Sequence, residues 1–374
     1  MTATISRILT PAQSEAWHVV GHAEARALLA DERIGLSHPD PSNAAWYRND
    51  DVAGRPHGGS DKEYAEHRVW RRSMALVFSN ARLTAAAADA GEIADELLRD
   101  VAVRERPVDL ISAFAIPFAS RIILGMMDIP VSDLELFQRW SSEGAVTGDL
   151  SRALDGMQQM LSFVMRLARE RRGGDRQDVI SHLMREVAAS GSAKDNTRAV
   201  KLLAGMLAFG RETPAAALVS GVLLLLTHPE QRDRLLADPD LIPSAVEEIL
   251  RFFPPPAATP DGLLRYAHTK FTVGEHVIGR GDMLLIDIFR ANFDERVFAA
   301  PELFDIGRQP NPHLGFGSGP YMCNFAKLAR LELAAGLGQL FARLPSLELA
   351  VPAWELRYKG HLRTRVLEAL PVVW

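Results

Sequence analysis

Helical periodicity constrains the fold of this chain more than any other feature of its sequence. Apolar residues recur at helical spacing over most of residues 62–253, in segments separated by short polar breaks, and Pro254-Pro255-Pro256 then stops the pattern. Residues 263–290 alternate between apolar and polar side chains and contain several glycines, which predicts short strands joined by turns. No internal repeat divides the chain. We therefore expect a mainly α single domain over residues 1–374 with a small β region.

The N-terminal region combines regular and irregular segments. Trp17-His18-Val19-Val20 predicts the first strand, and residues 23–30 predict a helix after it. Residues 37–62 are rich in Pro, Asn, Asp and Gly around Trp46 and Tyr47, which indicates an irregular loop. Long loops of this kind often carry function.

Charge and hydropathy exclude several classes of partner. The net charge of -5 and the pI near 6.1 give no general attraction to nucleic acid or to anionic lipid, so we expect neither as a partner. The opening residues lack the positive start and apolar run of a secretory signal, which predicts a cytoplasmic protein. Residues 202–226 are long enough to span a membrane, but Arg211, Glu212 and Pro214 interrupt them. A buried helix is the better prediction.

Cys323 is the only cysteine, which excludes an internal disulfide and any multi-cysteine metal site. A single cysteine is most often an inert buried thiol. Cys323, however, ends a glycine-containing loop, residues 316–323, that leads directly into an Ala- and Leu-rich helical segment. A thiolate just before a helix is favoured by the helix dipole and by free backbone N–H groups. The sequence therefore favours a functional thiolate.

The residues around Cys323 also match a known pattern. Phe-Gly-x-Gly from Phe316 is followed by cysteine four residues after its second glycine, and then by Ala-x-Leu-Ala-Arg-Leu-Glu ending at Glu332. This combination resembles the haem-binding loop of bacterial cytochrome P450 enzymes. The resemblance implies the cytochrome P450 fold, a single triangular helical domain, and haem b with Cys323 as the axial ligand of its iron. A cysteinate ligand pushes electron density to the iron and favours cleavage of the O–O bond.

This chain departs from the family's pattern at three places. Tyr321 replaces the usual basic residue two before the cysteine, which removes a cation near a haem propionate, and the resemblance still implies that Tyr321 contacts the haem. Phe325 replaces the usual glycine two after the cysteine, where the family keeps close backbone contact. About sixteen residues precede the first predicted strand, fewer than the family's usual leader, so we expect a more open substrate entrance.

The resemblance also implies which residues bind the two haem propionates. His67 and Arg71 are four apart on one predicted helix face and resemble the family's His-x-x-x-Arg. Arg265, in Arg-Tyr-Ala, resembles its Arg-x-Ala element on the strand after the prolines. Taken singly, each is more often a solvated surface charge. Their order along the chain relative to Cys323 is the evidence.

A Glu-x-x-Arg pair supports the same family. Glu248 and Arg251 are three apart in a strongly apolar helical segment, which resembles the family's buried pair. Arg308 stands where the family has the third member of this network. A partnered guanidinium network tolerates burial that a single charge does not, so we expect these three residues to meet inside the protein.

The long apolar segment carries Gly210-Arg211-Glu212-Thr213-Pro214, whose Gly-x-Glu-Thr resembles the family's oxygen-activation segment. Reducing dioxygen at iron needs protons, which a carboxylate and a hydroxyl relay through ordered water. The resemblance implies that Thr213 lies over the iron with Glu212 as the acid behind it. Gly210 and Pro214 predict a loosened helical hydrogen-bond ladder there. The alternative is a core helix with one tolerated polar turn.

Together these features predict a haem-thiolate monooxygenase that hydroxylates, epoxidises or oxidatively couples a small organic substrate of specialised metabolism. No Gly-x-Gly-x-x-Gly fingerprint joins a strand to a helix, so we expect a ferredoxin and a ferredoxin reductase to supply electrons to a monomer. An acidic ferredoxin-like partner would bind to basic side chains, and the residues predicted for this docking are Arg68, Arg72, Lys327 and Arg330.

Two other functions stay open at this point. A peroxide-using or rearranging haem enzyme would not need the proton relay, and a haem-binding or sensory protein would show no turnover. For the substrate pocket, the resemblance implies lining by Trp46, Tyr47, residues 208–213, residues 257–259 and the turn near Val366. These residues are mostly small and apolar, which predicts a medium-sized hydrophobic or partly aromatic ligand.

Overall fold

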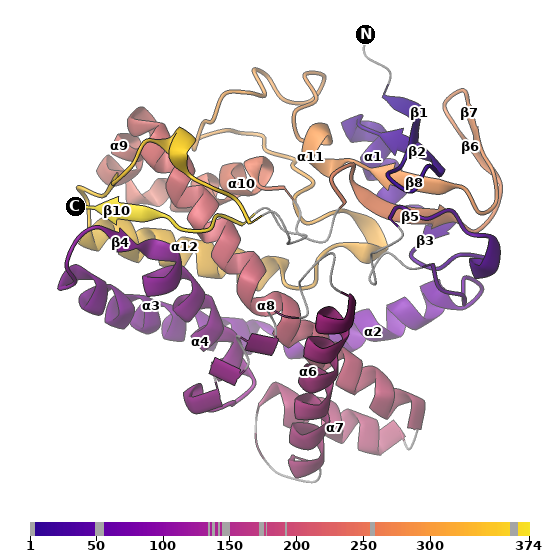
Figure 1. Cartoon of the computed structure of the whole chain (residues 1–374), viewed down its shortest axis with the longest axis horizontal. Coiled ribbons are helices and arrows are strands. Elements are labelled where there is room, and N and C mark those ends of the chain that lie inside the picture. Colours follow the sequence, from indigo (N-terminus) through magenta and orange to yellow (C-terminus); the bar gives the residue numbers. More distant parts are fainter. Residues whose placement is uncertain are drawn as a thin grey trace. The chain divides into compact units, whose positions relative to one another are not determined.

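The computed structural model describes residues 4–48, 56–133, 135–136, 139–140, 143, 150–171, 176, 178–190, 193–254, 259–359 and 366–374. The chain divides into two compact units. Unit 1 comprises Met1–Arg72 and Glu247–Asn324, and unit 2 comprises Ser73–Val246 and Phe325–Trp374. Unit 1 holds the larger sheet and unit 2 holds most of the helices (Figure 1). The single domain expected over the whole chain stays a prediction.

A five-stranded sheet forms the centre of unit 1. Its strands lie in the order β1 (Ile5–Leu9), β2 (Glu15–Val19), β8 (Met283–Ile286), β5 (Leu263–Ala267) and β3 (Ile34–Gly35). β2 and β8 are parallel, with Trp17 opposite Leu284, and the other neighbours are antiparallel. Every residue of β8 is buried, which explains why Met-Leu-Leu-Ile is continuously apolar instead of alternating.

The strand prediction is confirmed in the main but is incomplete. β2 overlaps the strand predicted at Trp17, and α1 (His22–Leu29) matches the helix predicted after it. β1 lies before them and is not foreseen, because its sequence Ile-Ser-Arg-Ile-Leu does not alternate between apolar and polar residues. In the 263–290 region, β5, β8 and a hairpin of β6 (Phe271–Val273) and β7 (His276–Ile278) are the expected short strands.

Helices dominate unit 2, which confirms the mainly α fold. They are α3 (Asn80–Ala102), α4 (Ile116–Met126), α6 (Leu150–Glu170), α7 (Val179–Ser190), α8 (Ala193–Thr227), α9 (Pro229–Ala237) and α12 (Ala326–Arg343). A small sheet of β4 (Val108–Asp109), β10 (Pro371–Val373) and β9 (Glu348–Leu349) accompanies them. α2 (Glu63–Val77) and α10 (Ile242–Phe252) each continue from one unit into the other, and α11 (Ile288–Ala291) belongs to unit 1.

Short helical turns complete the described structure. They are η1 (Pro41–Asn43), the π-helical η2 (Ile111–Ala115), η3 (Val131–Asp133), η4 (Pro239–Leu241), η5 (Gly319–Tyr321) and η6 (Ala353–Glu355). η2 leads directly into α4, as π turns often do at the start of a regular helix.

α8 is the core helix of unit 2, as its hydropathy predicts. Residues 203–227 are apolar enough to cross a membrane, but the helix packs against α4, α6, α7 and α12. It is helical from Ala193 to Thr227 with Pro214 inside it, and because proline has no N–H the backbone bond to the carbonyl of Gly210 is absent, while the loosening predicted around it stays a prediction. Gly210 has a packing role instead, since a Cβ there would lie 2.8 Å from Cγ1 of Ile123 on α4.

Candidate active site

Cys323 lies between η5 and the first residue of α12 in a tightly turned loop of unit 1. Its backbone N–H donates to the carbonyl of Phe316 at 2.8 Å, which closes the loop on itself. Gly317 and Gly319 have φ values of 73° and 67°, a region that glycine enters without strain. A Cβ on Gly319 would lie 2.6 Å from the carbonyl oxygen of Leu29, the last residue of α1, so the end of this helix packs tightly against the loop. The cysteine is partly exposed.

Two predicted site residues on α2 hold this loop through its carbonyls. Nε2 of His67 donates to the carbonyl of Pro320 at 2.8 Å. The guanidinium of Arg71, one helical turn further on, donates to Pro320 at 3.1 Å and to Met322 at 2.7 Å. Burial is the main reason why the pKa of His67 lies below its ordinary value, so the ring is neutral at pH 7.

Tyr321 has a partner that the sequence does not reveal. Its hydroxyl donates to the carboxylate of Glu63 at 2.6 Å, and its ring stacks on His67 with centroids 4.2 Å apart. Burial and then the Glu63 carboxylate raise the pKa of Tyr321 well above its ordinary value, so the hydroxyl stays protonated. The only signal for Glu63 is its place at the start of a helix, where acidic residues are common for electrostatic reasons alone.

Arg265 on β5 is a buried cation, 7% exposed. Its guanidinium donates to the carbonyl of Leu264 at 2.7 Å and lies 5.3 Å from the ring centroid of Tyr321. Among the described residues it forms no ion pair with a carboxylate, and burial lowers its pKa. A buried guanidinium without an anionic partner is costly. The arrangement therefore suits an anionic ligand such as a haem propionate, which would supply the missing charge.

The predicted Glu-x-x-Arg network is confirmed in unit 1. Glu248 and Arg251 are fully buried and form two hydrogen bonds of 2.8 Å. Arg308 donates from Nε to the same carboxylate at 3.1 Å, in the place expected for the third member. The Arg251 guanidinium also donates to the carbonyls of Asn292 and Leu303, which ties α10 to the segment before the cysteine loop.

In unit 2, the predicted acid Glu212 and hydroxyl Thr213 are consecutive residues of α8, and of the two only Glu212 lines the cavity described next. Arg211 is 2% exposed and donates to Glu212 at 2.6 Å, while burial lowers the pKa of Arg211 against the effect of that carboxylate. Glu212 lines a cavity of about 30 Å³ together with Ser220, Lys359, Val366 and six apolar or small residues. A cavity of this size with polar groups on its wall is large enough for an ordered water molecule.

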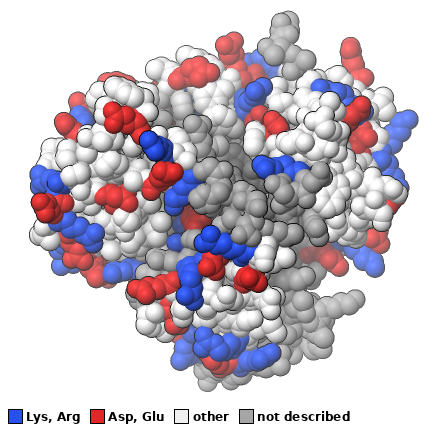
Figure 2. Space-filling view, viewed as in Figure 1, with Lys and Arg blue, Asp and Glu red and all other residues white. Residues whose placement is uncertain are grey.

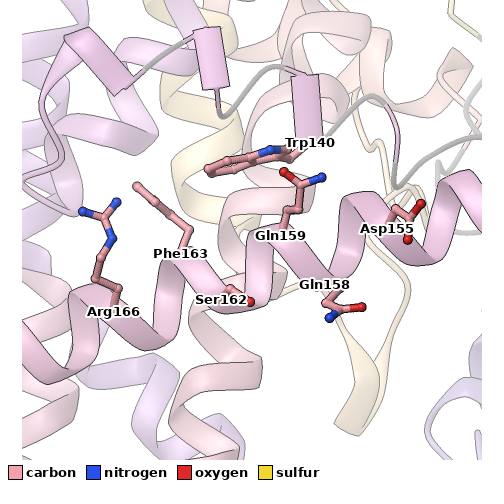
Figure 3. A pocket seen from close by; sticks show the side chains of 7 residues that line it. All are labelled: Trp140, Asp155, Gln158, Gln159, Ser162, Phe163 and Arg166. Atoms are coloured by element: carbon pink, nitrogen blue, oxygen red, sulfur yellow. The ribbon is translucent and has the colours of Figure 1, made fainter.

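A second pocket of unit 2, with a volume of about 530 Å³, lies along α6 (Figure 3). Figure 3 shows Phe163 and Gln159 directed toward the ring of Trp140, while Gln158 points away from it. The centroids of Trp140 and Phe163 are 5.5 Å apart, and the rest of the lining is mostly polar. None of the predicted site residues lines this pocket, so it does not enter the assignment of the active site.

Comparison with known proteins decides the family. Residues 135–347 match the family model described as cytochrome P450. Pentalenolactone synthase of Streptomyces exfoliatus is 35% identical over 99% of this chain and 93% of its own length. The chain belongs to the cytochrome P450 family. Mycinamicin IV hydroxylase/epoxidase of Micromonospora griseorubida is 32% identical to this P450 over 100% of the chain and 93% of its own length.

Solved structures support the same fold. Substrate-free cytochrome P450 PimD, a polyene macrolide antibiotic pimaricin epoxidase, superposes with a TM-score of 0.86 at 34% identity, covering 99% of this chain and 93% of PimD. This P450 is a monooxygenase that acts on a small organic molecule, with a thiolate-ligated haem and electrons from redox partners. The buried guanidinium of Arg265 and the loop that ends at Cys323 are compatible with an anionic cofactor of this kind.

Two sequence-based expectations need correction or completion. Tyr47, predicted to line the substrate pocket, is 2% exposed and packs in a buried cluster with Tyr266 and Met283 of the sheet. Its hydroxyl donates to Asp261 at 2.8 Å, and burial with this contact raises the pKa of Tyr47 to about 12. Phe325 directs its ring onto Phe78 within unit 2, with centroids 4.9 Å apart. Residues 257–258 of the predicted pocket lie outside the described residues.

Proposed function

We propose that this P450 hydroxylates or epoxidises a hydrophobic molecule of specialised metabolism, with haem b held by Cys323. The observation that carries the proposal is the cysteine loop, whose carbonyls are held by His67 and Arg71 beside the buried Arg265. The names of similar enzymes support the substrate class, since they act in pentalenolactone, mycinamicin and pimaricin metabolism.

The chain's own residues would bind the haem as follows. When bound, the haem supplies the binding and reductive cleavage of dioxygen at its iron. Cys323 would be the iron ligand, and Arg265 would pair with a propionate because it has a full charge and no carboxylate partner among the described residues. His67 and Arg71 would orient the loop and give a donor to the second propionate. Tyr321 would contact the haem with its ring, since its hydroxyl is bonded to Glu63.

Glu212 and Thr213 would deliver protons. A carboxyl group that lines a water-holding cavity accepts a proton from that water and passes it to a neighbouring hydroxyl. The Arg211 guanidinium, 2.6 Å from Glu212, would hold the carboxylate in one orientation. The mostly apolar lining of the cavity would restrict the entry of bulk water, which would limit the release of reduced oxygen species. This relay favours a dioxygen-using enzyme over a peroxide-using one.

A ferredoxin and its reductase would supply the electrons. This P450 would act as a monomeric, cytoplasmic, single-domain protein to which they bind. Arg68 and Arg72 are exposed one turn apart on α2, and Lys327 is exposed on α12 near Arg330. Figure 2 shows basic and acidic side chains interspersed on the face it displays, which favours local docking over general attraction to polyanions. Reversing the charge of Arg72 and Arg330 should slow reduction at low ionic strength. Unchanged rates would contradict this docking site.

The test of the proposed function is the absorption spectrum of the reduced protein with carbon monoxide. We expect a strongly red-shifted Soret band in the wild type, and its loss in Cys323→Ser with the fold preserved by circular dichroism. A spectrum that this substitution leaves unchanged would overturn thiolate ligation by Cys323. Substrate-dependent electron consumption would then separate a monooxygenase from a haem protein without turnover, and turnover driven by peroxide alone would favour the peroxide-using alternative.

A further inference from the structure

The clearest unexplained feature of unit 1 is the carboxylate of Glu63, the first residue of α2. We propose that Glu63 is a positioning residue that holds the cysteine loop in its haem-binding form through the hydroxyl of Tyr321. The proposal rests on the proposed function, because it assumes that this loop binds haem. It concerns a residue that no motif of the sequence indicates.

Glu63 is surrounded by donors from three distant parts of the chain. It accepts hydrogen bonds from the backbone N–H of Leu36 at 2.7 Å and of Ser37 at 2.8 Å, and also from the Ser37 hydroxyl. Tyr321 donates at 2.6 Å, and Nε2 of His268 lies 3.5 Å away. The side chain is 12% exposed. A carboxylate with this many donors is fixed in place and works as an anchor.

The backbone around Glu63 is arranged to admit it. A Cβ at Gly35 would lie 2.5 Å from Oε2 of Glu63, so glycine at this position leaves space for the carboxylate among its donors. Its place in the first turn of the 15-residue α2 also favours a negative charge. Burial acts to raise the pKa of Glu63, but the hydrogen bonds from His268, Ser37 and Tyr321 outweigh it and hold the pKa far below its ordinary value. Glu63 is therefore an anion at all working pH values.

The bond to Glu63 determines what Tyr321 does. Because its hydroxyl is committed, the side chain cannot turn toward a propionate as a basic residue at this position would. Its ring instead lies between two haem-directed groups, stacked on His67 at 4.2 Å and 5.3 Å from the guanidinium of Arg265. The ring thus orders both side chains, and the nearby Glu63 charge partly offsets that of Arg265.

The same bond fixes the loop two residues before the cysteine. Gly319 presses against α1, the carbonyls of Pro320 and Met322 are held by α2, and Tyr321 is tied to Glu63. Each residue from 319 to 322 is therefore held by contacts within the protein itself. Pre-organisation of this kind improves ligand retention, because the loop does not have to be ordered on binding.

The experiment compares holoprotein variants Glu63→Gln, Tyr321→Phe and the double variant. We would measure haem transfer to an excess of apomyoglobin and the haem reduction potential. Each single variant should lose haem roughly tenfold faster, since a hydrogen bond to a charged group is lost or weakened. If the two residues act through one bond, the double variant should lose haem no faster than the faster single variant. Glu63→Gln should also shift the potential to a more positive value, because a negative charge near Arg265 is removed.

A matched control and two contrary results make the test decisive. Tyr266→Phe removes a buried tyrosine hydrogen bond to Ala45 in the same unit, and should leave haem transfer and potential unchanged. Unchanged haem transfer in both single variants would overturn the proposal, as would effects that simply add in the double variant. If Cys323→Ser keeps the wild-type spectrum, the proposed function fails. If the thiolate spectrum is present while these variants behave as wild type, only the positioning role fails.

Discussion

Replacing Glu248 by glutamine should strongly destabilise the fold. Glu248 is fully buried, and its two carboxylate oxygens accept five hydrogen bonds. Two come from Arg251 at 2.8 Å, and one each comes from the backbone N–H of Asp305 at 3.1 Å, Nε of Arg308 at 3.1 Å and Nδ2 of Asn311 at 3.0 Å. Glutamine keeps the shape, but its amide N–H₂ would face donors, and the guanidinium groups of Arg251 and Arg308 would lose the buried anion that they share.

The magnitude follows from the burial of the charges. Breaking a buried ion pair by removing one partner costs about 3–5 kcal/mol, because the remaining charge has no compensation. An unfolding entropy of about 2.1 cal/mol/K per residue corresponds to about 0.8 kcal/mol/K for 374 residues. We therefore expect Tm to fall by about 4–6 °C if unfolding is cooperative.

Thermal unfolding followed by far-UV circular dichroism would measure this effect. Glu247→Gln is the matched control, because Glu247 is one residue earlier, 30% exposed, and keeps a hydrogen-bond acceptor for His313. Its free energy of unfolding should change by less than about 1 kcal/mol. A Glu248→Gln variant whose Tm falls no more than that of this control would contradict the prediction, since the buried network would then contribute nothing beyond a partly buried pair.

Three further predictions concern other parts of the chain. Burial raises the pKa of Glu332 above 4.5 in the folded state, and neither of its oxygens has a hydrogen-bond partner in the described structure. The folded protein therefore keeps a proton that the unfolded chain releases, so the free energy of unfolding falls as pH rises above about 4.5. Glu332→Gln removes this ionisable group. In urea denaturation it should raise the free energy of unfolding at pH 7 but not at pH 4. Glu212→Gln and Thr213→Ala should each lower product formation about 100-fold while the protein continues to consume electrons. The diverted electrons would be measured as peroxide released per electron consumed. If both variants still used all their electrons for product formation, the relay would be contradicted. Gly262→Ala should lower the free energy of unfolding by at least about 1–3 kcal/mol in the same urea assay, because φ is 120° and a Cβ would lie 2.5 Å from the carbonyl carbon of Ile286. An unchanged free energy of unfolding would mean that the turn has another conformation.

Local patterns in the sequence predicted the family and indicated much of the candidate site. The cysteine loop is contiguous from Phe316 to Cys323, and Glu212 with Thr213 is one step of a helix. Glu248 and Arg251 are three residues apart in a periodic apolar segment, so a helix necessarily places them side by side. Features of this kind need no knowledge of distant partners, and the structure reproduces their geometry.

The hydrogen-bonding and packing partners of the site residues depend on the tertiary structure. Glu63 meets Ser37, His268 and Tyr321, which are separated from one another by many tens of residues, so no window of sequence contains the contact. Tyr47 looks like a loop residue with a functional role, yet the sheet buries it. Burial and hydrogen bonding between distant segments depend on how the whole chain packs, whereas helical spacing depends only on the backbone geometry of neighbouring residues.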